Sequence, residues 1–133
     1  MSTFETLYAY PTGRTSRADF LRGLLPLLAA AAFYALLVKV GRNGEWVMVM
    51  FLFPGSVLLA RRLHDLGQTA WLLLAPGALA VAAIWMHMAN KTNPPLEPAV
   101  ALAAAIVIAG FFVWGLAANG QADANRYGPP PPA

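Results

Sequence analysis

The chain has 133 residues, of which 59% are hydrophobic and 11% are charged, and its formal net charge is +3. Soluble domains carry about 25% charged residues, so this composition excludes an ordinary soluble fold and predicts a single membrane domain. Cysteine does not occur, which excludes disulfides, thiol nucleophiles and thiolate metal ligands. The small net charge lies beside the apolar blocks and requires no nucleic-acid partner.

The N-terminal segment before the first apolar block reads as the start of a helix. Residues 1–20 have neither a long apolar run nor a cleavage-site pattern, so we expect no signal peptide and an uncleaved first span. Ser16-Arg17-Ala18-Asp19 is a capping box, in which the Ser16 hydroxyl can accept a hydrogen bond from the Asp19 amide. This pattern predicts that the first helix begins here.

Four apolar blocks predict four membrane-spanning helices at about residues 21–40, 46–63, 71–89 and 99–118. The second block is short, since about 15 apolar residues cover only about 22 Å of a roughly 30 Å hydrocarbon layer. We therefore expect its helix to continue through Arg61 and Arg62, whose guanidinium groups would reach the headgroups. In the fourth block, alanines at 101, 105 and 109 predict close packing of a helix within the monomer or between copies.

The distribution of Lys and Arg predicts which side of the membrane each loop faces. Six cations fall on one side of the four predicted spans and three on the other, which places both termini in the cytoplasm. The six are Arg14, Arg17, Arg22, Arg61, Arg62 and Arg126, and the three are Lys39, Arg42 and Lys91. The loops near Asn43 and Thr92 would then lie outside. The predicted organisation is a four-helix transmembrane domain over 1–120 and a cytoplasmic proline-rich tail over 121–133.

A charged segment follows the second apolar block. At about 100° per residue, Arg61, His64 and Asp65 fall on one side of a helix with Arg62 at its margin, and Leu63 points away. Arginine forks suit phosphate, and a histidine beside an aspartate could transfer a proton. The alternative is a structural role, because Asp65 could form an ion pair with Arg61 at i,i+4 or with Arg62 at i,i+3 on the same helix.

Three short motifs give the chain a resemblance to a known family. They are Gly13-Arg14-x-x-Arg17-x-x-Phe20, Ala60-Arg61-Arg62-Leu63-His64-Asp65-x-Gly67 and Asn125-Arg126-Tyr127-Gly128-Pro129. In this order they resemble the domain-of-unknown-function 805 family of small bacterial inner-membrane proteins. The resemblance implies a four-helix membrane domain and no established activity. The chain departs from the family at Leu21, Gln68 and Leu72, where an aromatic residue, a basic residue and a second tryptophan are common.

Together these features favour a non-enzymatic protein of the bacterial inner membrane, either a lipid-headgroup-binding module or one that assembles with a partner. The bilayer itself, anionic phospholipid, a second copy or another membrane protein are the expected partners, with no cofactor and no metal. An alternative is a small transporter or lipid-modifying enzyme in which His64 and Asp65 transfer a proton. We further expect Arg126 to turn back toward Asp65 or Asp19. The candidate ligand residues are Arg14, Arg17, Arg61, Arg62, His64, Asp65 and Arg126.

Overall fold

The computed structural model describes residues 4–38, 44–89 and 97–132, and these form an all-α fold. A short helix and a 3₁₀ turn accompany four long helices. The elements are α1 (Phe4–Tyr8), α2 (Arg17–Val38), α3 (Gly44–Asp65), η1 (Ala70–Leu73), α4 (Leu74–Ala89) and α5 (Glu97–Ala117). Each predicted span lies mainly on one long helix, although residues 71–73 of the third belong to η1 and residues 39–40 of the first lie outside the described residues. α3 continues through Arg61 and Arg62, as expected from its short apolar block.

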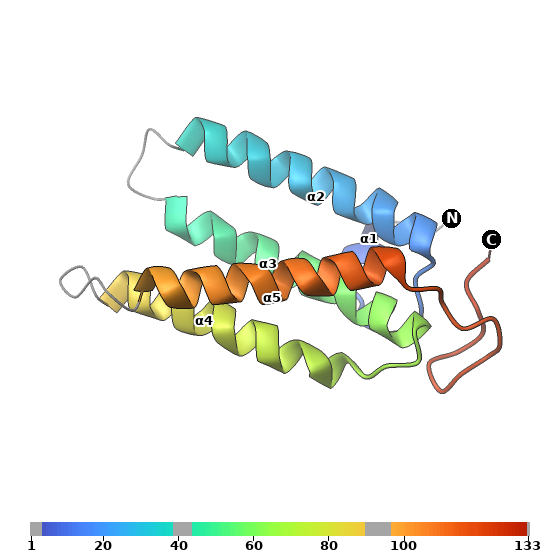
Figure 1. The fold of residues 1–133 in the computed structure, drawn as a ribbon. Coiled ribbons are helices and arrows are strands. Elements are labelled where there is room, and N and C mark those ends of the chain that lie inside the picture. The colour runs from blue at the N-terminus through green and yellow to red at the C-terminus, as the bar shows by residue number, and fades with distance from the viewer. Residues whose placement is uncertain (1–3, 39–43, 90–96, 133) are drawn as a thin grey trace.

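The four long helices lie side by side and alternate in direction (Figure 1). α2 packs chiefly on α3, and α4 packs on α5, while α5 also contacts both α2 and α3. The start of α2, the end of α3, the start of α4 and the end of α5 therefore share one end of the molecule, together with α1 and the tail. We call this the polar end. The expected outer loops near Asn43 and Thr92 lie outside the described residues.

Local capping explains where two of these helices begin at the polar end. The backbone N–H of Asp19 donates to Ser16 Oγ at 3.1 Å, which is the bond that the capping box predicts. Thr69 caps η1 by accepting from the Trp71 N–H at 3.3 Å.

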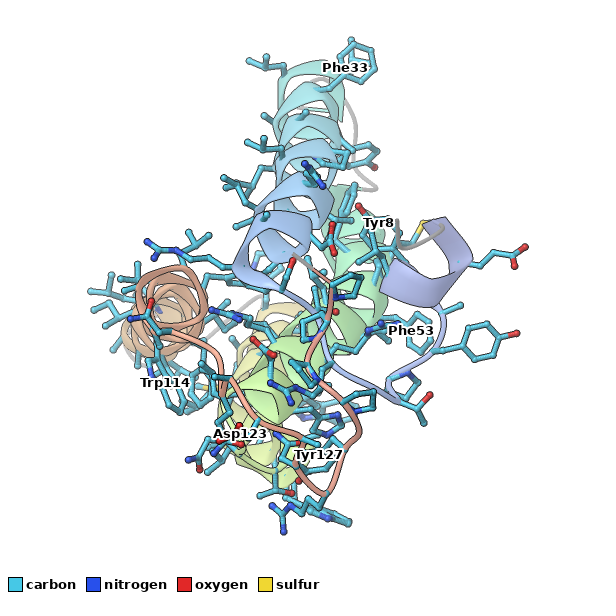
Figure 2. The ribbon with its side chains drawn as sticks, turned by 90° about the vertical axis from the view of Figure 1, so that its right-hand side faces the viewer. Tyr8, Phe33, Phe53, Trp114, Asp123 and Tyr127 are labelled. Carbon is cyan, nitrogen blue, oxygen red and sulfur yellow. The ribbon has the colours of Figure 1, made fainter. Side chains whose placement is uncertain are left out.

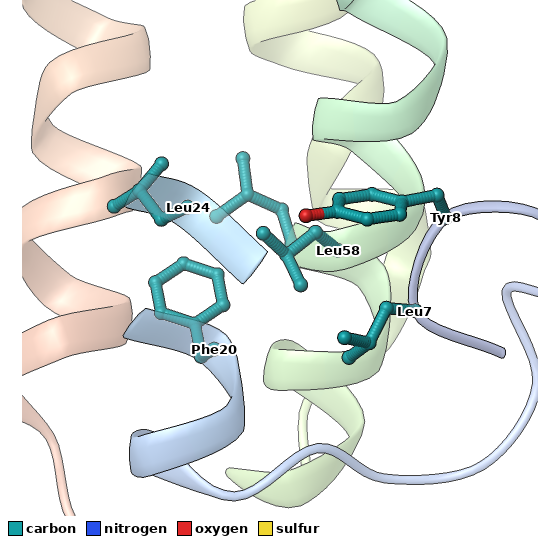
Figure 3. Packing of buried hydrophobic residues seen from close by; sticks show 6 residues of the cluster. Leu7, Tyr8, Phe20, Leu24 and Leu58 are labelled. Carbon is teal, nitrogen blue, oxygen red and sulfur yellow. The ribbon is translucent and has the colours of Figure 1, made fainter. Parts of the chain in front are cut away.

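The apolar core lies near the polar end, where α1 packs against α2 and α3 (Figure 3). Phe20 and Leu58 are fully buried at its centre, and the Tyr8 hydroxyl donates to the Gly23 carbonyl at 2.7 Å. A Cβ at position 23 would lie 2.9 Å from a Leu58 methyl group, so glycine is what permits this close approach of α2 and α3. The remaining members of the cluster are Leu7, Leu24 and Leu59.

Elsewhere along the helices, large apolar side chains face outward. Phe33, for example, is 65% exposed and projects from α2 (Figure 2). By length and composition, Ala70–His87 and Pro98–Ala117 are apolar enough to cross a membrane, and only 11% of each is buried within the protein. A core helix of a soluble protein would be mostly buried, which these two are not. Other exposed apolar side chains are Leu25, Leu28 and Leu36 on α2, Phe53 on α3, and Leu102, Ile106 and Val113 on α5.

Candidate functional site

The last turn of α3 is buried around its whole circumference. Arg61, Arg62, His64 and Asp65 are at most 9% exposed, and Leu63 between them is 2% exposed. The expected polar face is therefore not open to solvent, since Leu63 and the charged side chains around it are all covered by other parts of the protein. The physical reason is that segments from both ends of the chain cover this turn, so all its faces meet protein (Figure 2).

Asp65 accepts hydrogen bonds from two arginines. Its Oδ1 lies 3.0 Å from Arg14 Nε and 2.9 Å from Arg14 Nη2, and its Oδ2 accepts from Arg62 Nη1. The Arg14 and Asp65 side chains are 1% and 4% exposed. Arg14 and Arg62 thus hold the single carboxylate from two sides, and we call Arg14, Arg61, Arg62 and Asp65 the buried cluster.

The Arg62 guanidinium group joins three parts of the chain. Its Nε donates to the Gly115 carbonyl at 2.7 Å, its Nη2 donates to the Ala118 carbonyl, and its Nη1 lies 3.4 Å from the Thr15 carbonyl. Gly115 and Ala118 lie in and just after the last turn of α5, where unpaired carbonyls carry partial negative charge. The helix end therefore supplies part of the charge compensation that one carboxylate cannot give to three guanidinium groups.

Arg61 fastens the start of the chain to α3. Its Nε donates to Thr15 Oγ1 at 2.9 Å, and its Nη2 donates to the Arg14 carbonyl at 3.2 Å. In return, the Thr15 N–H donates to the Arg61 carbonyl at 3.2 Å. Residues 14 and 15 are thereby held in register beside the end of α3.

Arg14 also binds the tail, which we define as residues 121–132. Its Nη1 donates to the carbonyls of Asp123 at 2.8 Å and Gly128 at 3.3 Å, and its Nη2 donates to the Gln121 carbonyl. The Gln121 N–H donates to the Asp65 carbonyl at 2.9 Å. Residues 121–128 of the tail therefore cross the end of α3 and are bound to it, and we call them the strap (Figure 2).

The His64 ring holds the tail from the other side. Its Nδ1 lies 3.1 Å from the Gly13 carbonyl, so it donates to that oxygen, and its face stacks on Tyr127 with 3.8 Å between ring centroids. The Arg126 guanidinium lies 4.8 Å from the Tyr127 ring centroid. Burial lowers the pKa of His64; its hydrogen bond to Gly13 opposes this shift, and the positive charges of Arg126 and Arg61 add to it.

A tight turn in the tail completes the strap. Asn125 and Gly128 form an isolated antiparallel bridge, and Asn125 Oδ1 accepts from the Tyr127 N–H at 2.9 Å. Asn125 Nδ2 donates to the His64 carbonyl at 2.9 Å. Gly128 has φ of +122°, a backbone conformation that favours glycine.

The glycine before the strap is dictated by close approach. A Cβ at Gly120 would collide with the Asp65 carboxylate. Only a glycine at this position lets the chain leave α5 and pass over the carboxylate.

The candidate residues divide into two groups. Arg14, Arg61, Arg62, His64 and Asp65 come together at the polar end, whereas Arg17 and Arg126 are exposed. The expected contact of Arg126 with Asp65 or Asp19 is wrong: Arg126 lies over Tyr127, and Arg14 holds Asp65 in its place. The sequence analysis did not identify Thr15, Gly120 and Gln121. The turn-forming residues Asn125 and Gly128 are the signal in the sequence that could have indicated how the tail folds back.

The buried cluster has the chemistry of a structural site that connects segments of the same chain. Among the described residues, every buried side-chain nitrogen and oxygen has a hydrogen-bond partner. Within the same residues, no group of three His, Cys, Asp or Glu side chains could hold a metal ion. The observed contacts bind the segment before α2, the end of α3, the end of α5 and the tail into one unit.

These features define a class: an all-α protein with exposed apolar helices and an arginine-rich polar end closed by its own tail. Residues 8–129 match the family model described as protein of unknown function (DUF805), and the chain belongs to that family. The match covers nearly the whole chain and confirms the resemblance carried by the three motifs. Neither the search of curated proteins nor that of solved structures gave a match.

Proposed function

We propose that this is a four-span protein of the bacterial inner membrane with both termini in the cytoplasm. One observation carries the proposal: ionisable side chains are buried at one end, while large apolar side chains cover the outside of the helices. Water would favour the opposite distribution, whereas a bilayer favours this one. The membrane would surround α2, α3, α4 and α5, and the polar end would meet the cytoplasmic headgroups.

The exposed part of the polar end suits anionic lipid. Arg17 and Arg22 are exposed on the first turns of α2, and Leu21 and Leu25 are exposed on the same helix. The Arg22 side chain is 68% exposed even though it lies 3.2 Å from Asp19. Cations at the end of an apolar helix face place positive charge at headgroup level, where phosphate is available. The function proposed is therefore binding of anionic headgroups by a non-enzymatic membrane module.

The buried cluster would serve this surface indirectly. Because its arginines bind Asp65, the Thr15 hydroxyl and main-chain carbonyls, they connect the segment before α2, the end of α3, the end of α5 and the tail, and they leave lipid contact to the exposed arginines. No observation among the described residues favours proton transfer by His64 and Asp65. Both Asp65 oxygens accept from arginines, and His64 Nδ1 is engaged by Gly13.

The topology is tested by labelling single cysteines, which is clean because the chain has none of its own. Cysteine at Thr92 should react with an impermeant maleimide in intact cells. Cysteine at the exposed Gln68 should react only after permeabilisation. Labelling of the Gln68 position in intact cells would refute the orientation.

The lipid function is tested by native mass spectrometry of protein released from nanodiscs that contain equal amounts of phosphatidylglycerol and phosphatidylcholine. Wild type should retain phosphatidylglycerol preferentially, and Arg17→Gln/Arg22→Gln should lose that preference. Lys91→Gln is the control, because it removes a positive charge from the opposite predicted side of the membrane. Equal lipid retention by all three proteins would contradict headgroup binding at α2.

A further inference from the structure

The chain continues beyond the strap as four consecutive prolines. The family match ends at residue 129, so Pro130, Pro131 and Pro132 lie outside what the family model describes. Pro129, Pro130 and Pro132 are exposed. None of the strap's hydrogen bonds given above involves these prolines, since the last residue they use is Gly128. The hydrogen bonds of the strap therefore account for residues 121–128 and not for the prolines, of which Pro131 is half-buried.

Consecutive prolines favour the polyproline II helix, which has three residues per turn and no internal hydrogen bonds. Pro129 and Pro132 are three residues apart, so in that conformation they lie on the same edge, one turn from each other. The carbonyl groups of such a helix remain free to accept hydrogen bonds from another molecule. This is the form in which proline-rich segments bind aromatic-lined grooves.

The strap presents this segment from a fixed base. The Asn125–Gly128 bridge and the stacking of Tyr127 on His64 hold the residues immediately before the first proline. A ligand whose base is already ordered loses less conformational entropy when it binds. The base also carries charge: Arg126 is exposed and precedes Pro129 by three residues.

We propose that residues 126–132 are a docking ligand for a protein domain with an aromatic-lined, acidic groove that binds polyproline II. The aromatic side chains would stack between the proline rings, and an acidic residue at the rim would pair with Arg126. This site is independent of the lipid contact proposed for α2, because it lies on the tail and needs no bilayer.

The experiment uses the full chain in detergent micelles, with purified SH3 and WW domains as probes of polyproline recognition. Calorimetric titration should show that at least one of the two domains binds the wild-type protein. Pro129→Ala/Pro132→Ala should weaken that binding by about tenfold or more, because both rings leave the groove. Pro11→Ala is the matched control, since Pro11 is also exposed but stands alone before α2; it should bind as wild type does.

A second pair of variants tests the role of charge. Arg126→Glu should weaken binding to the domain with an acidic groove, whereas Arg126→Lys should bind as wild type does. The reason is that a contact at the rim of the groove needs a positive charge more than it needs the planar guanidinium group. Unchanged thermal unfolding of the double proline variant would show that the strap stays closed. The proposal is overturned if neither domain binds wild type, or if the double proline variant binds as tightly as Pro11→Ala.

Discussion

Replacing Asp65 by asparagine removes the only carboxylate from the buried cluster while keeping its shape. The Asp65 side chain is 4% exposed and accepts from both Arg14 and Arg62. Asparagine would offer one oxygen in place of two and would turn an N–H₂ group toward one of the two guanidinium groups. Removing one partner from a buried ion pair costs about 3–5 kcal/mol. We expect a loss of about 3 kcal/mol, near the lower limit, because the surrounding carbonyls continue to accept from the arginines.

The assay is unfolding in mixed micelles, followed by circular dichroism as the denaturing detergent is increased. Asp123→Asn is the matched control, because Asp123 is exposed and reaches Arg14 through its main-chain carbonyl. The control should change the free energy of unfolding by less than about 0.5 kcal/mol. If Asp65→Asn costs no more than the control, the cluster does not stabilise the fold and the reasoning about its charges fails.

Three other measurements test separate parts of the polar end. Because the folded-state pKa of His64 is lowered from 6.5, His64 is protonated in the unfolded chain before it is protonated in the folded protein as the pH falls, so the free energy of unfolding should decline below about pH 6.5. His64→Gln should remove this part of the decline. Equal slopes of stability against pH for the two proteins between pH 7.5 and 5.5 would contradict the prediction. Gly120→Ala should destabilise the fold by about 2 kcal/mol or more through collision with Asp65, whereas Gly77→Ala, with open space around its Cβ, should be neutral or slightly stabilising. Arg62→Lys keeps the charge but reaches fewer of its carbonyl partners, and a loss of about 2 kcal/mol is expected in the same unfolding assay; wild-type stability would mean that charge alone suffices.

The helices were predictable because each depends on local features of the sequence. Each of the four apolar blocks lies mainly on one long helix, and the Ser16 hydroxyl caps α2 as the motif predicts. The Arg62–Asp65 ion pair is also local, since residues three apart on a helix are neighbours. For the same reason, the charged segment after the second block was found as the candidate site.

The pairing within that site was not predictable, because its partners are distant in sequence. Arg14 and Asp65 are separated by 51 positions, and Arg62 and Gly115 by 53. The positive charge beside a chain-reversal sequence in the tail suggested Arg126 as a partner for Asp65 or Asp19, but Arg14 pairs with Asp65. A hydrogen bond between segments depends on where α5 ends and how the tail turns over α3, which no single-helix periodicity encodes.

The sequence by itself therefore determined a composition typical of membrane proteins, the positions of the four long helices, and the residues that carry charge at one end of the molecule. Only the tertiary structure decided that five of those residues are buried and that the tail closes over them. The physical reason is that burying guanidinium groups requires acceptors on several sides at once. Besides the Asp65 carboxylate and the Thr15 hydroxyl, those acceptors are main-chain carbonyls at residues 14–15, 115–118 and 121–128, and main-chain groups leave no signature in the identity of a side chain.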